Sequence, residues 1–279
     1  MQPLLVIRSE RGQMSAIERR IADFILENTH LLRDYSSQQL ANALGISQSS
    51  VVKFSQKLGF KGYPDLKFSI GEAVARNGGD AQPSEDAAAG GQQALSEDLW
   101  RAKGRAEEET RLLNPPERVD AVVEMLRGAD KAFVVGTGED GVAARAFAIR
   151  LSLLGFPAIH HYDPVLVPAE VATSQPGDLL ILFSERGQQS SLCQLARLFQ
   201  RRGGKVVSVT RHTANPLRAH ADLALLVSAH DERSHVEPLL YQAAQQQLLD
   251  LLFLLLCADE SRRRRLDDYH EHVRSLQDP

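Results

Sequence analysis

The sequence predicts an all-helical N-terminal unit joined to an α/β unit whose mostly parallel sheet is flanked by helices. Three observations support this division. Between residues 14 and 76, apolar side chains recur at helical spacing. Residues 77–93 are rich in Gly and Ala and nearly devoid of large apolar side chains, as in a flexible linker. From Lys131 onward, runs of Val, Ile and Leu alternate with helical segments, which is typical of a parallel sheet covered on both faces.

Length and charge are consistent with two units of different function. The chain has 279 residues, which is comfortable for two domains. Its formal net charge of −4 does not by itself favour a nucleic-acid partner. Residues 1–77, however, carry 10 basic and 7 acidic side chains, a net of +3, whereas the remainder carries 22 and 29, a net of −7. This asymmetry fits a DNA-binding module joined to a domain with another partner.

Cysteine usage and hydropathy favour a reducing compartment. Cys193 and Cys257 lie far apart in apolar surroundings without a CxxC partner, so core packing is favoured over a disulfide or zinc site. The apolar stretch 4–7 is too short for a signal peptide. The run 248–258 is interrupted by Asp250 and is too short to span a membrane. We therefore expect a cytoplasmic protein without a membrane partner.

Residues 37–60 are the most informative stretch of the N-terminal unit. Two helical patterns, 37–44 and 47–58, flank Gly45. Gly45 can adopt the left-handed conformation that ends a helix, and Ser47 is a good N-cap for the helix that follows. This is the layout of a helix-turn-helix, whose second helix is presented to the major groove.

The polar face of the second helix carries side chains suited to DNA. Gln can pair with adenine, Lys can reach guanine and Ser can serve either base, while the later lysines suit phosphates. The alternative is a small helical subdomain with a solvated polar face, because short look-alikes of this motif are common. The predicted DNA-binding residues are Ser37, Gln48, Ser49, Ser50, Lys53, Lys57, Lys61 and Lys67.

The remaining elements follow from periodicity and capping signals. An amphipathic helix is expected at 14–28, where Ser15 and Glu18 form a capping box, and another helix begins around Asp65. In the α/β unit, strands are expected at 132–136, 158–162, 178–184, 205–211 and 223–228, and helices at about 95–113, 116–127, 136–155, 165–174, 191–203 and 237–258. Residues 262–272 are expected to form a charged helix or tail. The predicted boundaries are a DNA-binding domain at 1–77, a flexible linker at 78–94 and the α/β domain at 95–279.

These segments together resemble the RpiR/MurR-type bacterial regulators. The resemblance rests on IERRIADFILEN, LANALGISQSSVVKFSQKLGFKGYPDLK and FVVGTGEDGVAAR, and it covers nearly the whole chain except the linker and the C-terminal end. It implies an all-α helix-turn-helix head joined to an α/β SIS-like (sugar isomerase) domain. It also implies a phosphosugar-responsive transcription factor, dimeric or tetrameric, without catalytic activity.

The resemblance is looser where SIS domains hold phosphate. That family typically uses a G-x-G-x-S turn after the first strand and an S-x-S-G-x-S/T loop after the third. Here the first turn keeps Gly136 and Gly138 but has Asp140 in place of the serine, and the second loop keeps only Ser184. A helix N-terminus attracts anions, but Asp140 would fill that role from within the chain and repel a phosphate.

We therefore expect phosphate binding to be lost, or moved to Arg186 with help from Gln188, Gln189 and Ser190. Two carboxylates fit a ligand bearing hydroxyls or an amine better than a phosphosugar. The alternative is that Asp140 only caps its helix while the neighbouring glutamate is solvated. The expected effector-binding residues are Gly136, Thr137, Gly138, Glu139, Asp140, Ser184, Arg186, Gly187, Gln188 and Glu237.

Other chemistry is not expected. His160 and His161 are adjacent on a strand and so point to opposite faces, and no ligand-spacing motif supports a metal site. The turn GTGEDG lacks the third glycine of a dinucleotide motif at the proper spacing, so no cofactor is expected. The run 262–265 is more typical of a solvated helix end than of a nucleic-acid contact.

Three functions remain as alternatives. The first, which we expect, is a regulator, with repression as the expected mode, that binds double-stranded operator DNA as a homodimer or homotetramer and senses a small sugar, sugar phosphate or sugar acid. The second is a sugar-phosphate isomerase or lyase with an accessory DNA-binding head. Such an enzyme needs a positioned base and a secure phosphate anchor, and this anchor is eroded here. The third is a regulator whose SIS-like domain only dimerises.

Overall fold

The computed structural model describes residues 3–29, 32, 35–76, 91–161, 165–231 and 233–277. The chain forms two compact units, Met1–Ser96 and Glu97–Pro279. The expected linker at 78–94 lies outside the described residues as far as residue 90. Residues 91–94 are helical rather than part of a linker, because Gln92, Gln93 and Ala94 are good helix formers that open a long helix.

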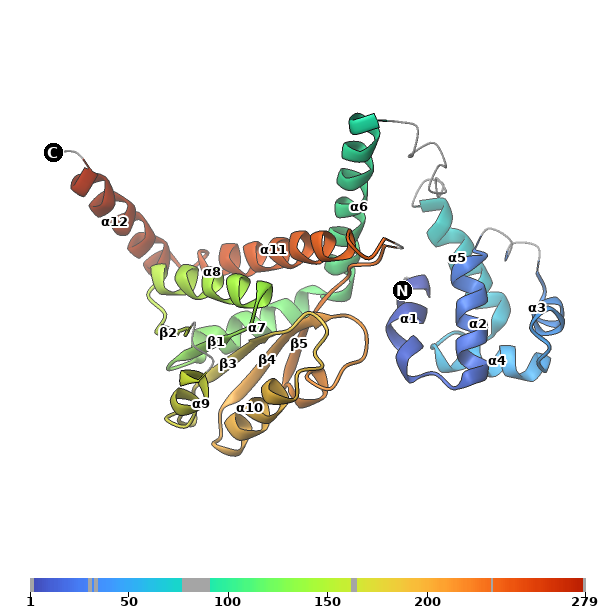
Figure 1. Ribbon diagram of the computed structural model, residues 1–279, viewed down its shortest axis with the longest axis horizontal. Coiled ribbons are helices and arrows are strands. Elements are labelled where there is room, and N and C mark those ends of the chain that lie inside the picture. The colour runs from blue at the N-terminus through green and yellow to red at the C-terminus, as the bar shows by residue number, and fades with distance from the viewer. Residues whose placement is uncertain are drawn as a thin grey trace. The chain divides into compact units, whose positions relative to one another are not determined.

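The first unit is entirely helical in its described residues (Figure 1). A single core gathers buried side chains from five helices, among them Ile7, Ile21, Leu40, Phe54 and Leu66. The first of these helices was not expected, because its apolar run PLLVI is too short to show a helical period. The elements are α1 (Pro3–Glu10), the 3-10 helix η1 (Arg11–Gln13), α2 (Ala16–Glu27), α3 (Ser37–Leu44), α4 (Gln48–Lys57) and α5 (Tyr63–Arg76).

The local signals of the helix-turn-helix form as expected. Ser15 and Glu18 make the capping box of α2. Gly45 ends α3 with φ 61°, in the left-handed region that favours glycine. The Ser47 side chain accepts the N–H of Ser50 and so caps α4. The turn between α3 and α4 is thus fixed by one glycine and one serine.

The second unit contains a five-stranded parallel sheet in the order β2-β1-β3-β4-β5. Its strands are β1 (Ala132–Val135), β2 (Ala158–Ile159), β3 (Leu179–Phe183), β4 (Lys205–Arg211) and β5 (Leu223–Val227). Its helices are α6 (Gly91–Leu113), α7 (Pro116–Gly128), α8 (Glu139–Leu153), α9 (Leu166–Val171), α10 (Ser190–Arg201), the 3-10 helix η4 (Arg218–His220), α11 (Glu237–Leu256) and α12 (Glu260–Gln277).

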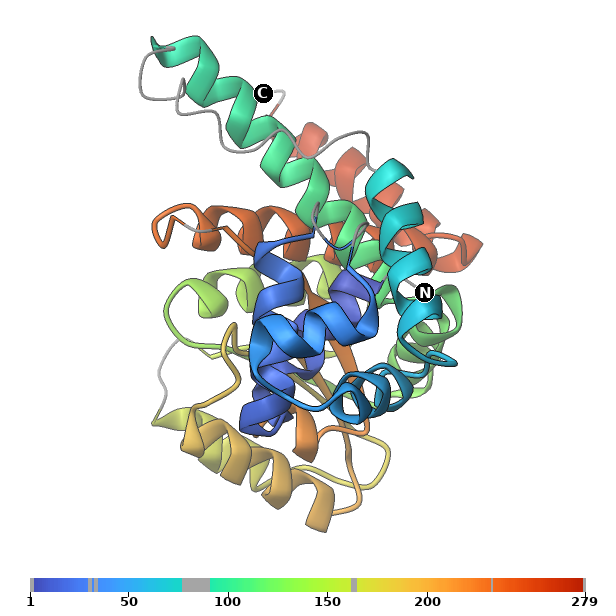
Figure 2. The same cartoon turned by 90° about the vertical axis from the view of Figure 1, so that its right-hand side faces the viewer.

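Helices cover both faces of this sheet (Figures 1 and 2). Alternate strand residues point to opposite faces. Val134 and Ile181 pack into one core with α7, α8 and α11, whereas Phe133 and Leu180 pack into another with α9 and α10. The near-continuous apolar strands of the sequence are therefore buried on both sides, as expected for a parallel sheet.

Two elements differ from expectation in extent. Within residues 158–161, the described part of the expected strand 158–162, only Ala158–Ile159 pair with β1, and Tyr162 lies outside the described residues. His160 leaves the ladder and its Nδ1 hydrogen-bonds the Val134 carbonyl oxygen at 2.8 Å. The charged C-terminal segment is a helix, α12, most of whose side chains are exposed.

Among the described residues, α11 alone has the length and mean hydropathy of a membrane span, 20 residues at 1.2. Eight of its side chains are buried, including Leu240, Leu248, Leu252 and Leu256. These leucines belong to the core formed with α7, α8 and the sheet. We therefore regard α11 as a core helix of the α/β unit.

Candidate functional site

The exposed side of α4 carries polar side chains in its N-terminal half. Gln48, Ser49 and Lys53 are exposed, and Ser50 is half-buried. The Gln48 Nε2 donates to Ser37 Oγ at 2.9 Å, and this contact ties α4 to the first turn of α3. The face that a recognition helix would present is thus formed by side chains that can donate and accept hydrogen bonds.

The lysines assigned to phosphate contacts differ in their partners. Lys57 Nζ lies 2.9 Å from Glu18 Oε1 on α2, and this hydrogen bond holds the pKa of Glu18 below its ordinary value. Lys67 is half-buried and its Nζ donates to the Tyr35 carbonyl oxygen at 3.1 Å. Lys61 is exposed, and its backbone N–H bonds Asp65. Lys53, Lys57 and Lys61 are therefore all exposed, but Lys57 is bound by Glu18, and the half-buried Lys67 is bound by the Tyr35 carbonyl.

A pocket of about 200 Å³ lies in the second unit, where β1 and β3 end and α8 and α11 begin. This is the carboxyl edge of the parallel sheet, where α/β folds commonly bind ligands. Its lining is polar and largely acidic. The lining residues are Glu139, Asp140, Glu185, Tyr241, Gln242 and Gln245.

Asp140 closes the expected phosphate site from within. Its Oδ2 accepts the backbone N–H of Glu185, in the loop after β3, at 2.9 Å. Gly138 occupies the N-cap position of α8 without a side-chain cap, so Asp140 does not cap its own helix. Burial, followed by the charges of Glu185 and Glu139, raises the pKa of Asp140.

The other lining residues are linked in pairs. Gln242 Nε2 donates to Glu139 Oε2 at 2.8 Å, and Gln245 Nε2 donates to the Tyr241 hydroxyl at 3.1 Å. Burial raises the pKa of Tyr241 well above its ordinary value, and the charges of Asp140 and Glu185 raise it further. Tyr241 is therefore a neutral phenol at physiological pH.

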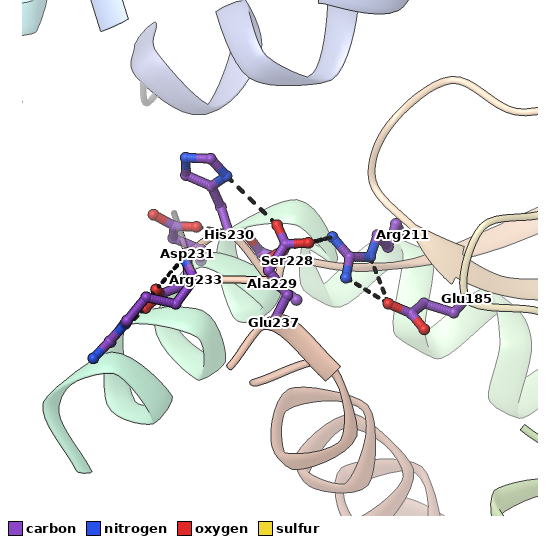
Figure 3. Close-up of polar contacts among 9 residues, drawn as sticks. Glu185, Arg211, Ser228, Ala229, His230, Asp231, Arg233 and Glu237 are labelled. Atoms are coloured by element: carbon purple, nitrogen blue, oxygen red, sulfur yellow. Dashed lines mark hydrogen bonds and ion pairs between the residues drawn. The ribbon is translucent and has the colours of Figure 1, made fainter. Parts of the chain in front are cut away.

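Arg211, at the end of β4, holds two acidic side chains together (Figure 3). Its Nε and Nη2 lie 2.9 and 2.5 Å from Glu185 Oε1, and its Nη1 lies 3.2 Å from Glu237 Oε2. Nη1 also donates to the Ala229 carbonyl oxygen at 2.9 Å. Burial lowers the pKa of Arg211, but the two ion pairs outweigh this effect and raise it.

The structure brings only part of the expected effector set to the pocket. Glu139 and Asp140 line it, whereas Arg186 and Gln188 are exposed and are not among the lining residues. An anion site rebuilt on Arg186 therefore finds no support in the pocket geometry. Glu237, expected at the pocket, instead binds Arg211.

The remaining expected residues shape the surrounding loops. A Cβ on Gly136 would lie 2.5 Å from the Asp140 carbonyl oxygen, so glycine permits α8 to approach β1 closely. Gly187 has φ 60° and faces Asn215. Thr137 Oγ1 exchanges hydrogen bonds with the Gln189 side chain at 3.1–3.2 Å, and Ser184 is buried.

Sequence reasoning missed Arg211, Glu185, Tyr241, Gln242 and Gln245. The signal that could have indicated Arg211 is a lone charge at the carboxyl end of an apolar strand, on the edge that carries the two loops. The tyrosine and the two glutamines lie on α11, for which the sequence predicted only a role in the core. Its second and third turns supply Tyr241, Gln242 and Gln245 to the pocket, and the apolar composition of the helix gives no sign of this.

Among the residues described, no cluster of three His, Cys, Asp or Glu side chains could hold a metal ion. His161 Nε2 instead lies 2.5 Å from Glu170 on α9. The geometry of His160, bound to a backbone carbonyl, likewise reflects a structural role.

Comparison with known proteins decides the family. A model described as the helix-turn-helix domain of the rpiR family matches residues 1–77, and a SIS domain model matches residues 125–255. The chain is 36% identical over 264 residues to a protein of Escherichia coli (strain K12) named "Uncharacterized HTH-type transcriptional regulator YfhH", covering 92% of each chain. The protein belongs to the rpiR family. It is thus a helix-turn-helix transcriptional regulator with a SIS domain.

Solved structures share the fold of this rpiR-family chain. The NanR protein of Vibrio vulnificus, complexed with ManNAc-6P, matches with a TM-score of 0.62 at 22% identity over 99% of this chain and all (100%) of that one. The sugar isomerase domain of an RpiR transcription factor from Sphaerobacter thermophilus matches with a TM-score of 0.56 at 19% identity, covering 63% and 98%. A putative sugar-phosphate isomerase from Listeria monocytogenes matches at 0.53 and 22%, covering 60% and 91%. Because these identities are low, they show the fold alone.

Proposed function

We propose that this rpiR-family regulator is a cytoplasmic repressor that binds a palindromic operator through α4 and is controlled by a small, unphosphorylated carbohydrate-type effector in the pocket of its SIS domain. The observation that carries this proposal is that one unit presents an exposed polar surface on α4, while the other unit contains an acidic pocket. A ligand that binds the DNA-competent and DNA-incompetent arrangements unequally shifts the equilibrium between them.

The proposed DNA interface divides into base and phosphate contacts. Gln48, Ser49 and Lys53 lie on the exposed side of the N-terminal half of α4, where recognition helices meet base edges. Ser37 supports Gln48 through its hydrogen bond. Lys61, exposed beyond the end of α4, suits a phosphate. Lys57 and Lys67 contribute charge to this region while remaining bound to protein partners.

The chemistry of the pocket supports an effector without a phosphate group. Three of its six lining side chains are carboxylates, and none is basic. The nearby cation, Arg211, is already bound by two carboxylates. An anion would meet like charge, and the Glu185 N–H that could bind it is occupied by Asp140. Hydroxyl or ammonium groups, by contrast, would donate hydrogen bonds to these carboxylates.

An isomerase function is the weaker candidate. The fold is shared with proteins named as sugar-phosphate isomerases, but fold alone does not carry an activity. An isomerase needs an anchor for the phosphate of its substrate, and none of the residues lining the pocket supplies a positive charge. We expect the purified protein to show no turnover of phosphosugars.

We further propose that the protein acts as a homodimer or higher homo-oligomer. α8 and α11 together expose large apolar side chains, with Val142 and Leu254 each 67% and Ile149 50% exposed. A pair of helices with such a face is suited to bury it against the same face of a second copy, and a two-fold dimer matches a palindromic operator.

The experiment that tests the function is selection of bound duplexes from a random DNA library by the full-length chain. We expect recovery of one palindromic motif, bound at least about a thousandfold more tightly than unrelated DNA. Recovery of unrelated sequences only would contradict the proposal.

A further inference from the structure

The side chain of Arg211 connects Glu185 in the pocket wall to the chain between β5 and the first turn of α11 (Figure 3). We call the described residues of this stretch, 228–231 and 233–237, the β5–α11 segment. Glu185 lines the pocket and accepts two hydrogen bonds from Arg211. The same guanidinium contacts Glu237 on the first turn of α11 and the carbonyl oxygen of Ala229 just after β5. A displacement of Glu185 therefore changes the contacts of a group that also binds Ala229 and Glu237.

The β5–α11 segment is held on its other side by α6. Ser228 Oγ donates to Glu109 Oε2 at 2.5 Å, and the Ser228 N–H donates to Thr110 Oγ1 at 2.9 Å. Further along, Arg233 Nη1 lies 2.7 Å from Asp98 Oδ2. α6 therefore contacts this segment at two places, near its C-terminus at Glu109 and Thr110 and at Asp98, the second residue of the second unit.

Arg211 is placed to respond to a change at Glu185. Its side chain is only 14% exposed, so its charge depends on its two carboxylate partners rather than on water. A ligand group that donates to Glu185 Oε1 uses the oxygen that accepts from both Nε and Nη2 of Arg211. The arginine would then be left with Glu237 and Ala229, which both belong to the β5–α11 segment.

We propose that Arg211 couples occupancy of the pocket to α6, so that an effector competing for Glu185 changes how firmly the β5–α11 segment holds this helix. α6 is the first described helix after the segment that follows the helix-turn-helix unit in the chain, so its anchorage is a route from the pocket toward DNA. This inference rests on the proposed function, because it describes how binding in the same pocket is transmitted to α6. The coupling runs through contiguous contacts, from Glu185 through Arg211 to Glu237 and Ala229.

Hydrogen exchange on the full-length chain without any ligand tests the coupling. Glu185→Gln keeps the size of the side chain and removes the charge that holds Arg211. We expect the amides of residues 97–113 and 229–240 to exchange roughly fivefold faster or more than in the wild-type chain. The matched control is Glu170→Gln, a carboxylate paired with His161 beside β2 and comparably exposed. It should leave exchange in α6 unchanged.

A second background decides whether Arg211 carries the effect. In an Arg211→Met chain, Glu185→Gln should no longer alter exchange at residues 97–113, because the connecting side chain is absent. Should Arg211→Met fail to fold, Arg211→Lys serves in its place, because an ammonium cannot reproduce the two-sided contacts of the guanidinium.

Three results would overturn the inference: exchange that changes only around residues 184–190, an equal effect on α6 in the Arg211 background, or the same effect from Glu170→Gln. Operator binding by the wild-type chain is measured on the same preparation. Its absence would contradict the proposed function independently of these exchange results.

Discussion

Asp140 accepts the backbone N–H of Glu185 at 2.9 Å, across 45 residues of sequence. This contact joins the turn after β1 to the loop after β3, the two segments from which SIS-like domains are expected to hold phosphate. In this chain the donor is satisfied by a carboxylate of the protein itself. The fold of the family is therefore retained, while three carboxylates line the edge of the sheet where the resemblance led us to expect a phosphate.

Restoring serine at this position tests that interpretation. Asp140→Ser removes the charge and frees the Glu185 N–H, so we expect the variant to be stabilised by glucose 6-phosphate while the wild-type chain is not. The measurement is the shift in melting temperature at millimolar ligand. A wild-type chain that responds to this phosphosugar as strongly as the variant would show that Asp140 does not block the site.

The raised pKa of Asp140 has a consequence for stability. Because the folded-state pKa lies above the ordinary value of 3.8, the contribution of this group favours folding at low pH and is lost as the pH rises through the folded-state pKa. Asp140→Asn keeps an oxygen to accept the Glu185 N–H and removes the charge. We therefore expect the variant to melt above the wild type at pH 7, with the difference shrinking toward zero near pH 4. A difference that grows as the pH falls would contradict this sign.

Substitutions on the helix-turn-helix unit separate base reading from phosphate binding. Gln48→Ala and Lys53→Ala should lower affinity for the selected operator by about 1–3 kcal/mol and relax discrimination at particular base pairs. Lys61→Ala should weaken operator and random duplexes alike and reduce the salt slope by about one. Fluorescence anisotropy with the operator and a random duplex at several salt concentrations distinguishes base contacts from phosphate contacts. Equal losses on both duplexes from Gln48→Ala would refute the recognition-helix assignment.

The apolar face of α8 and α11 can be tested by charge insertion. Leu254→Asp places a carboxylate in the proposed interface between copies, so we expect a shift from dimer to monomer in light scattering coupled to size exclusion. Leu276→Asp on α12 is the matched control, since this leucine is 74% exposed and lies outside that face. If both variants keep the oligomeric state of the wild type, another surface holds the copies together.

The glycine at the end of β1 is expected to matter for stability. A Cβ at residue 136 would meet backbone atoms of Asp140 and Gly141 at 2.5–2.9 Å, so Gly136→Ala should cost about 1–3 kcal/mol of unfolding free energy. Gly104→Ala, in the interior of α6 with open space around it, should instead be neutral or stabilising by up to about 1 kcal/mol. The measurement is the free energy of unfolding of each variant and of the wild-type chain, obtained from denaturant titration. A neutral Gly136→Ala would show that the turn adjusts.

Local signals predicted much of this fold. Gly45 and Ser47 define the helix-turn-helix because each acts on its immediate neighbours, and the parallel sheet follows from apolar strands separated by helices. The unpredicted features depend on partners distant in sequence. Lys57 was expected on phosphate because nothing near it indicates Glu18, which lies 39 residues earlier. A contact between Lys57 and a DNA phosphate therefore stays a prediction, and the ion pair with Glu18 counts against it.

The site shows the same limit. Glu139 and Asp140 were expected from a motif, and both line the pocket. Arg211 is the last residue of an apolar strand, where nothing in the sequence distinguishes it from a charged residue at the end of any other strand. Only the order of the strands in the sheet places it beside Glu185. Periodicity cannot indicate such a neighbour, because it arises from the pairing of strands rather than from spacing along the chain.

The most direct test of the account is the affinity of the full-length protein for its selected operator, measured with and without members of a paired panel: glucosamine, N-acetylmannosamine and glucose, each beside its 6-phosphate. We predict that an unphosphorylated member changes operator affinity by roughly fivefold or more while its phosphate does not. A change produced by the phosphates alone would contradict the proposed control by an unphosphorylated effector, because it would show that the acidic pocket does not exclude a phosphate group.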